Sequence, residues 1–455
     1  MSTGRIRIPA SGIPADELLA RMQDMRDEDA DWKSGRTFSL VYFAGERHTE
    51  LLKKAYTMFF SENALNPNAF PSLRQFENEV VAMTGAMLGG DENVAGTMTT
   101  GGTESILMAM KTYRQWARAT KPGITKPEVL LPLTAHPAFE KACAYFDLKA
   151  VHAPINSDFQ ADVKEMEKLI TKNTIVMVGS AVAYPHGVVD PIPELAGLAK
   201  KRDIGFHVDG CLGGFMLPWL KKLGYPIPDF DLSVPGVTSI SADIHKYGYA
   251  SKGTSVILYC DQDLRRHQFF TYSSWPGGIY ASPSMAGTRA GGAIATAWAA
   301  MMGMGEDGYM RLQKKTMETA RALMAGINDM DELYILGKPV MTVFAFASDT
   351  LDVFALADAM ARRGWYLNHL QFPACLHMIV SAAHAGVVEP FLSDMRESVA
   401  EVKANPQSSQ EGSAAMYGML ASIPERSTVD EYVVNALDRQ FTYTPKVSKE
   451  KERNS

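Results

Sequence analysis

The sequence has no hydrophobic run long enough to cross a membrane, and it is poor in cysteine. Its four cysteines are scattered and include no Cys-X-X-Cys pair, which argues against a disulfide framework and a zinc site. The first residues, MSTGRIRIPASG, carry no apolar segment of a signal peptide. A net charge of −6 gives no basic footprint for nucleic acid. We therefore expect a soluble, cytoplasmic protein in a reducing compartment, without a metal site.

The 455 residues are 46% hydrophobic and 21% charged, which predicts a large folded core. From about residue 97, short apolar runs alternate with helical patterns. The runs predict strands at 129–133, 150–155, 174–179, 204–209, 239–242 and 254–259. The helices between them are predicted at 105–118, 137–146, 162–170 and 192–202. This alternation is typical of an α/β protein with a mostly parallel sheet, whose ligands bind at the carboxyl ends of the strands.

We predict four parts along the chain. They are an N-terminal arm with helical segments (1–60), a large domain (61–310), a smaller C-terminal α/β domain (311–442) and a disordered tail (443–455). The smaller domain includes a predicted strand at 341–346 and predicted helices at 351–363 and 388–402. The tail is expected to be disordered because it is charged and almost free of apolar residues. The most apolar stretch, 293–304, is too short to span a membrane and predicts a buried helix.

Two polar side chains follow predicted strands where a ligand should bind. Lys246 comes after the strand 239–242, and a lysine that forms a Schiff base must sit in a site that lowers its pKa. Asp209 ends the strand 204–209, and a carboxylate fixed there can keep a pyridine nitrogen protonated. Each also has an ordinary alternative, since Lys246 alone fits a surface lysine and Asp209 alone fits a helix cap.

Two further segments could bind the phosphate group and the flat ring of a cofactor. Gly101, Gly102 and Thr103 open the helix that follows, and free amide groups at a helix start attract a phosphate. His136 follows the strand 129–133, where an imidazole can stack on a flat cofactor. Taken singly, the first also fits an ordinary glycine-rich turn and the second a structural histidine.

Along the chain, the four features follow one another as the glycine turn, His136, Asp209 and Lys246. In this order, they resemble the pyridoxal 5′-phosphate (PLP) site of the aspartate-aminotransferase-like fold, PLP-dependent transferase fold type I. The motifs HVDG…GGF and SADIHK are similar to those of the group II PLP-dependent decarboxylase family. Within that family, TTGGTESILMAMK, TAHPAFEKA, SISADIHKYGYASKGTS and WPGGIYASPSMAGTRAGG resemble the sphingosine-1-phosphate lyases. The resemblance runs from Val41 to Tyr443. The N-terminus lacks the membrane-spanning segment of eukaryotic lyases, so the sequence resembles the soluble, bacterial type.

The resemblance implies roles around the cofactor. Lys246 would form the Schiff base, Asp209 would pair with the pyridinium nitrogen, and His136 would stack on the ring. Contacts near the cofactor phosphate are implied for Gly102, Thr103, His245 and Thr288. Thr288 stands where the family usually has serine and would reach the phosphate from the neighbouring subunit, which implies an obligate homodimer.

A second anion site is implied because the substrates of these lyases carry a phosphate. Tyr42 matches a tyrosine of the N-terminal arm, and Lys252 would supply positive charge. An amino-acid decarboxylase has no need for an ammonium group at this position. The third contact is usually the histidine of a Leu-His-Pro turn. Here the turn is Leu65-Asn66-Pro67, and Asn66 can donate a hydrogen bond without bringing charge.

The implied reaction is a retro-aldol cleavage of sphingosine 1-phosphate, a phosphorylated sphingoid base, to a long-chain fatty aldehyde and phosphoethanolamine. Lys246, Tyr184 and His136 would be its catalytic residues. The base that removes the substrate's hydroxyl proton is Lys246, Tyr184 or the cofactor's own phosphate. Peripheral contact with a membrane would give access to the lipid.

Two other functions fit parts of the same pattern. A PLP-dependent L-amino-acid decarboxylase acting on glutamate, aspartate or an aromatic amino acid would share the cofactor site, although Tyr42 and Lys252 favour the lyase. An inactive protein of this fold that serves as a scaffold or binding module is the second alternative. The presence of Lys246, Asp209 and His136 argues against it.

Overall fold

The computed structural model describes residues 6–405 and 425–444, together with 407, 410, 412, 415–417, 419 and 423. Of the tail that we predict to be disordered, residues 445–455 lie outside the described part of the chain. Among the residues described, no helix combines the length and the apolar character needed to cross a membrane.

A seven-stranded sheet forms the centre of the protein, in the order β1–β7–β6–β5–β4–β2–β3. The strands are β1 (Ala95–Thr99), β2 (Glu128–Pro132), β3 (Lys149–Ala153), β4 (Thr174–Ser180), β5 (Gly205–Asp209), β6 (Ser239–Ala242) and β7 (Ser255–Tyr259). Five neighbouring strands, β6, β5, β4, β2 and β3, are parallel, whereas β7 runs antiparallel to both of its neighbours. The mostly parallel sheet is as predicted, and β1 is a strand that the sequence analysis missed.

Alternating side chains of the central strands enter cores on opposite faces of this sheet. On β4, Met177 belongs to one core, and Val176 and Val178 belong to the other. A strand buried on both faces needs apolar residues at every position, which explains the continuous apolar runs in the sequence. The helices of this region are α3 (Pro71–Met87), α4 (Gly102–Thr120), α5 (Ala138–Phe146), α6 (Val163–Leu169), α7 (Ile192–Lys201), α8 (Leu217–Lys222), α9 (Gln262–Arg265) and the 3₁₀ turn η1 (Arg266–Gln268).

A second, antiparallel sheet has the order β10–β11–β13–β12. Its strands are β10 (Tyr334–Ile335), β11 (Val343–Ala347), β12 (Asn368–Gln371) and β13 (Ala374–Ile379). The helices packed around it are α11 (Val353–Arg362), η2 (Ala382–Gly386) and α12 (Val388–Ala404). Helix α14 (Arg426–Gln440) follows later in the chain. The strand and two helices predicted here match β11, α11 and α12 closely.

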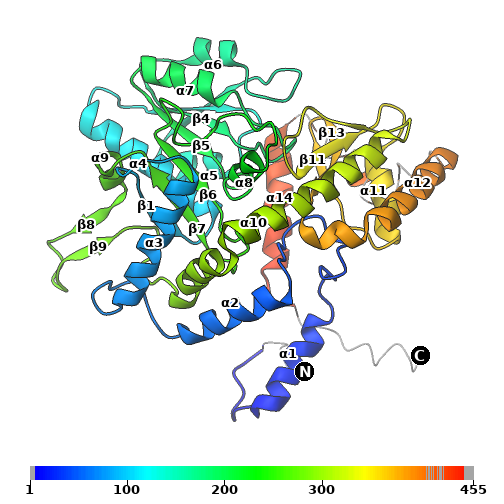
Figure 1. Cartoon of the computed structure of the whole chain (residues 1–455), viewed down its shortest axis with the longest axis horizontal. Coiled ribbons are helices and arrows are strands. Elements are labelled where there is room, and N and C mark those ends of the chain that lie inside the picture. Colours follow the sequence, from blue (N-terminus) through cyan, green and yellow to red (C-terminus); the bar gives the residue numbers. More distant parts are fainter. Residues whose placement is uncertain are drawn as a thin grey trace.

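Helix α10 (Gly291–Asn328) crosses the protein between the two sheets (Figure 1). It contacts α2 (Glu46–Met58) and α3 on the side of the large sheet, and η2 and α12 on the side of the small one. The backbone leaves helical geometry at Gly305, where φ is +60°, a value that favours glycine. The predicted buried helix 293–304 is therefore only the first segment of a longer element.

The N-terminal arm is attached to the small sheet before it reaches α2. After α1 (Ala15–Arg26), Phe38 is fully buried and packs against the rings of Trp365, His384 and Phe391. The Ile379 backbone N–H donates to the carbonyl oxygen of Phe38 at 2.9 Å. This attachment fixes the segment that carries Tyr42. A separate hairpin, β8 (Phe270–Tyr272) and β9 (Tyr280–Ser282), projects from the large sheet (Figure 1).

Candidate active site

A cavity of about 330 Å³ lies at the carboxyl ends of β5 and β6 and at the start of α4. Six residues predicted to surround a cofactor line it together: Gly102, Thr103, His136, Asp209, His245 and Lys246. They come from four separate stretches of chain, so their meeting in one cavity is a property of the fold. Among the residues that also line it, Thr100, Glu104, Cys211 and Asp243 were not predicted as site residues.

The amine of Lys246 forms an ion pair with Asp243, with Nζ 2.9 Å from Oδ2. Burial lowers the pKa of Lys246, but Asp243, together with Cys211 and Asp209, reverses this. The pKa is therefore raised overall, contrary to the lowering expected from the sequence. Burial likewise raises the pKa of Asp243, and Lys246 and His245 reverse this to a net lowering. Asp243 is held in place because its Oδ1 accepts a 2.6 Å hydrogen bond from Ser255 on β7. Both groups of the pair are therefore charged at neutral pH.

His245 lies beside the same carboxylate and against the glycine turn. Its Nε2 is 3.7 Å from Asp243 Oδ2, and its Nδ1 accepts from the Thr254 backbone N–H at 3.3 Å. Burial lowers the pKa of His245 despite the opposing effect of Asp243. Its Cε1 lies 3.5 Å from where a side chain on Gly101 would begin. A neutral imidazole is thus fixed at the start of α4.

Asp209 and His136 are each oriented by the backbone that follows them. Asp209 is 7% exposed, and its Oδ1 accepts from the Cys211 N–H at 3.1 Å. His136 Nδ1 accepts from the Ala138 N–H at 3.1 Å, at the beginning of α5. Neither side chain depends on the other for its position. Both face the cavity that contains Lys246.

The glycine turn is packed too closely for a side chain at Gly102. A Cβ on Gly102 would lie 2.7 Å from Cys211 Sγ and 2.8 Å from Asp243 Oδ2, which is closer than real contacts allow. The turn is braced by Glu104, whose Oε2 accepts from the Thr100 N–H at 2.7 Å. The first amide groups of α4 have no partner within the helix and are suited to bind an anion.

Lys252 and Tyr42 meet beside this cavity. Lys252 Nζ lies 5.0 Å from the centre of the Tyr42 ring and donates to the His245 carbonyl oxygen at 3.2 Å. The Tyr42 ring also packs edge-on against Tyr247, with centroids 4.9 Å apart. Although the Lys252 side chain is exposed, the surrounding protein and then the charge of Lys246 lower its pKa to about 8. The predicted pair is therefore together in the structure.

Tyr184 lies in the loop after β4 and contacts two histidine rings. Its ring meets that of His136 edge-on, with centroids 6.3 Å apart, and is tilted by 33° over that of His377 at 4.4 Å. Burial raises the pKa of Tyr184, and the charge of Lys246 partly offsets this. The hydroxyl group is therefore within electrostatic range of the Lys246 amine. His377 was not assigned a role from the sequence.

Asn66 and Thr288 do not line this cavity. Both are exposed, and Asn66 Oδ1 accepts from the backbone N–H groups of Asn68 and Ala69. The two segments lie side by side, because Asn63 Nδ2 donates to Thr288 Oγ1 at 3.3 Å. These two predicted residues thus lie together on a surface outside the cavity, although Met285, three residues before Thr288, donates its N–H to Glu104 of the cavity wall.

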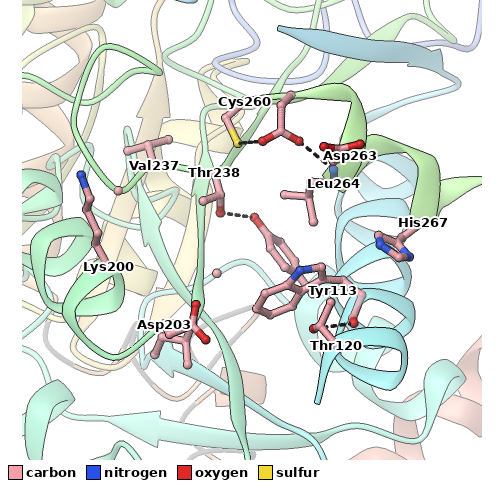
Figure 2. A pocket seen from close by; sticks show the side chains of 15 residues that line it. Tyr113, Thr120, Lys200, Asp203, Val237, Thr238, Cys260, Asp263, Leu264 and His267 are labelled. Atoms are coloured by element: carbon pink, nitrogen blue, oxygen red, sulfur yellow. Dashed lines mark hydrogen bonds between the residues drawn. The ribbon is translucent and has the colours of Figure 1, made fainter. Parts of the chain in front are cut away.

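Another cavity, of about 510 Å³, lies at the opposite edge of the large sheet, beside the first residues of β5 (Figure 2). The Tyr113 hydroxyl and Thr238 Oγ1 are 2.7 Å apart there, and Cys260 donates to Asp261. These four polar groups are thus partnered within the protein. It contains none of the predicted site residues.

Comparison with known proteins assigns the chain to a family. A pyridoxal-dependent decarboxylase conserved domain matches residues 30–348. The sphingosine-1-phosphate lyase of Oryza sativa is 47% identical over 96% of this chain and 82% of its own length. The chain belongs to the sphingosine-1-phosphate lyase branch of the pyridoxal-dependent decarboxylase family. A lyase of this branch from Rattus norvegicus is 44% identical over 96% of this chain and 77% of its own length.

Solved structures place the fold in the same family. A sphingosine-1-phosphate lyase from Burkholderia pseudomallei superposes with a TM-score of 0.89 at 39% identity, covering 97% of this chain and 98% of that one. A glutamate decarboxylase from Lactobacillus brevis shares the fold, with a TM-score of 0.76 at 19% identity over 87% of this chain and 95% of that one. The predicted fold type I, the family and its cofactor, PLP, are confirmed.

The residues of the family site fit this cofactor. The cavity combines a glycine turn at a helix start, an oriented carboxylate, a histidine and a lysine. Gly102 has no room for a side chain beside Cys211 and Asp243, and the backbone amides at this helix start suit a phosphate. Asp243, which the sequence analysis missed, carried a signal, since it precedes Lys246 by three residues in the turn after β6.

Proposed function

We propose that this lyase cleaves phosphorylated sphingoid bases, such as sphingosine 1-phosphate, to a long-chain fatty aldehyde and phosphoethanolamine. The observation that carries the proposal is the position of Lys252, with its amine against the Tyr42 ring and hydrogen-bonded to the residue before Lys246. A cation there suits a substrate that carries its own phosphate. An amino-acid decarboxylase would instead need a cation for the α-carboxylate.

The comparisons support the lyase over the decarboxylase alternative. The relatives at 44% and 47% identity are sphingosine-1-phosphate lyases. The glutamate decarboxylase is only 19% identical, so its similarity concerns the fold alone. The complete set of charged cavity residues also disfavours an inactive scaffold.

The roles of the cavity residues follow from their positions. PLP, when bound, supplies a ring that accepts the electron pair left when a substrate carbon–carbon bond breaks. Asp209 would hold the proton of the ring nitrogen, and His136 would stack on the ring. Gly102, Thr103 and His245 would surround the cofactor phosphate. Lys246 would attach the cofactor and yield that place to the substrate amine.

The cleavage itself needs a proton to leave the substrate hydroxyl group next to the amine-bearing carbon. As the proton leaves, the bond between the two carbons breaks, the aldehyde departs, and the remaining carbon takes up a proton to give phosphoethanolamine. We assign these proton transfers to Tyr184 and Lys246, and the effect of the Lys246 charge on the pKa of Tyr184 supports a shared site. Lys252 and Tyr42 would hold the substrate phosphate and so select which bond is aligned for cleavage.

We further propose a homodimer in which each site is completed by its neighbour. Asn66 and Thr288 share one exposed surface, so both would act on the cavity of the second subunit. Asn66 would contact the substrate phosphate and Thr288 the cofactor phosphate. The described cysteines are free thiols, which suits the proposed cytoplasmic location.

One assay tests the reaction. Purified protein loaded with PLP is offered sphingosine 1-phosphate and, separately, a panel of amino acids, while fatty aldehyde and carbon dioxide are measured together. Aldehyde with an equal amount of phosphoethanolamine, and no carbon dioxide, is the expected result. Carbon dioxide from an amino acid without any aldehyde would overturn the proposal. The Lys246→Ala variant is the control and should lack both the aldehyde and the absorbance of the attached cofactor.

A further inference from the structure

Tyr184 belongs to the large sheet's side of the protein, but the ring that covers it comes from the small sheet. His377 lies on β13, where it pairs in register with Ala345 of β11 and Asn368 of β12. Its ring centroid is 4.4 Å from that of Tyr184, with 33° between the planes. The small sheet thus contributes one contact to a side chain that is within electrostatic range of Lys246.

His377 places a polar ring in a fully buried position. It is 0% exposed, and neither ring nitrogen has a hydrogen-bond partner of good geometry among the described residues, although the Tyr184 backbone lies near enough to raise its pKa. Burying polar ring atoms with no better partner than this costs free energy. Burial lowers the pKa of His377 to about 4, which keeps the ring neutral and flat against the phenol at neutral pH.

The backbone that carries Tyr184 is already fixed by other contacts. Gly187 has φ of +67°, and a Cβ there would lie 1.8 Å from the Val343 carbonyl oxygen. The Val340 N–H donates to the Gly187 carbonyl oxygen at 3.2 Å. Because β11 and the residues just before it hold the loop, the remaining freedom of Tyr184 is the rotation of its side chain. The face of His377 and the edge of His136 bound that rotation.

We propose that His377 is a positioning residue, which stacks on Tyr184 and holds the phenol hydroxyl toward the reacting part of the substrate. The inference rests on the proposed function, because it assigns Tyr184 to the lyase reaction. His377 itself would touch neither the substrate nor the cofactor. Its contribution would be the flat face of the ring, and its nitrogens would take no part in proton transfer.

Three variants separate these contributions. His377→Leu removes the flat ring, His377→Gln keeps polarity without a ring, and His377→Phe keeps a flat ring without nitrogens. His369→Leu is the matched control, since His369 is also an imidazole of the small sheet stacked on an aromatic ring, that of Tyr417 at 4.9 Å. For each protein, kcat and KM for sphingosine 1-phosphate, the cofactor absorbance and the melting temperature are measured.

The expected loss for the Leu and Gln variants is about tenfold in kcat, with KM within about twofold of the parent, because only orientation is changed. His377→Phe should recover at least half of the parental kcat, and His369→Leu should keep it. A parental kcat in His377→Leu and His377→Gln would overturn the inference. So would a Phe variant as poor as the Leu variant, because the nitrogens would then be what matters.

A double-mutant cycle completes the test. In a Tyr184→Phe background, adding His377→Leu should change kcat by less than about twofold, since the hydroxyl group that His377 positions is already gone. Additive losses would show that His377 acts elsewhere and would overturn the inference. Failure of the proposed function is distinct from either result, because the parent protein would then release no aldehyde at all.

Discussion

The carboxylate of Asp243 lies 2.9 Å from the Lys246 amine, and its side chain is 1% exposed. A buried carboxylate at this distance keeps the amine protonated, which stabilises the pair but opposes attachment of an aldehyde. Only an unprotonated amine can attack the cofactor's carbonyl carbon. Asp243 therefore affects how readily the cofactor is attached, without being the group that is attached.

Replacing Asp243 by asparagine should therefore ease attachment of PLP at neutral pH. Removing the negative charge lowers the pKa of Lys246, so the pH midpoint for attachment to the cofactor-free protein should move down. Absorbance and borohydride trapping measure this midpoint. Ser255→Ala is the control, because it removes the 2.6 Å hydrogen bond to Asp243 but leaves the charge. An unchanged midpoint in Asp243→Asn would contradict the assigned effect.

A methyl group on Gly102 should weaken binding of the cofactor. The added Cβ would overlap Cys211 and Asp243, and such overpacking costs about 1–3 kcal/mol, or roughly fivefold to hundredfold in the PLP dissociation constant. Titration followed by absorbance measures it. Gly197→Ala in α7 has open space around the new atom and should leave the dissociation constant unchanged. Equal behaviour of the two variants would place the phosphate elsewhere.

The affinity for a phosphorylated substrate should fall at alkaline pH through Lys252. Its pKa is lowered to about 8, so the amine is charged below that value and loses its charge as the pH rises. Between pH 7 and 9 the charged fraction falls about tenfold, and KM should rise by up to the same factor. Lys252→Arg, which stays charged, should lack this rise. A rise that persists in the arginine variant would assign it to another group.

Mixed dimers test the proposed sharing of sites. Thr288→Val alone should retain PLP poorly, and Lys246→Ala alone should be inactive. If Thr288 serves the neighbouring site, a dimer with one chain of each kind has one intact site and one doubly altered site. Its activity should recover toward about half of the parental dimer. No recovery would mean that Thr288 acts within its own chain or not at all.

The sequence alone was sufficient to predict the elements that are buried along their whole length. β4 and β5 are buried on both faces and were predicted from continuous apolar runs. β1 was missed because AGTMT has no such run, and its strand conformation depends on pairing with β7, far along the chain. The second part of α10, beyond Gly305, was missed because its buried residues are mixed with charged ones.

The cofactor site was predictable because each strand end can be located from the sequence, and strand ends of a parallel sheet meet at one edge. The contact between Tyr184 and His377 was not, since it joins a loop of one sheet to a strand of another. Nor did the sequence indicate that Asn66 and Thr288 lie together outside the cavity. Such relations depend on how the two sheets and the N-terminal arm pack.

The antiparallel direction of β7 has an evolutionary consequence. Because β7 returns beside β6, one connection, residues 243–254, leaves the sheet and re-enters it at the same edge. It carries Asp243, Lys246 and Lys252. A substitution at Lys252 can alter the preference for a substrate while the cofactor lysine stays in place. An insertion or deletion would displace both amines at once, so diversification within this segment is confined to exchanges of side chains at constant length.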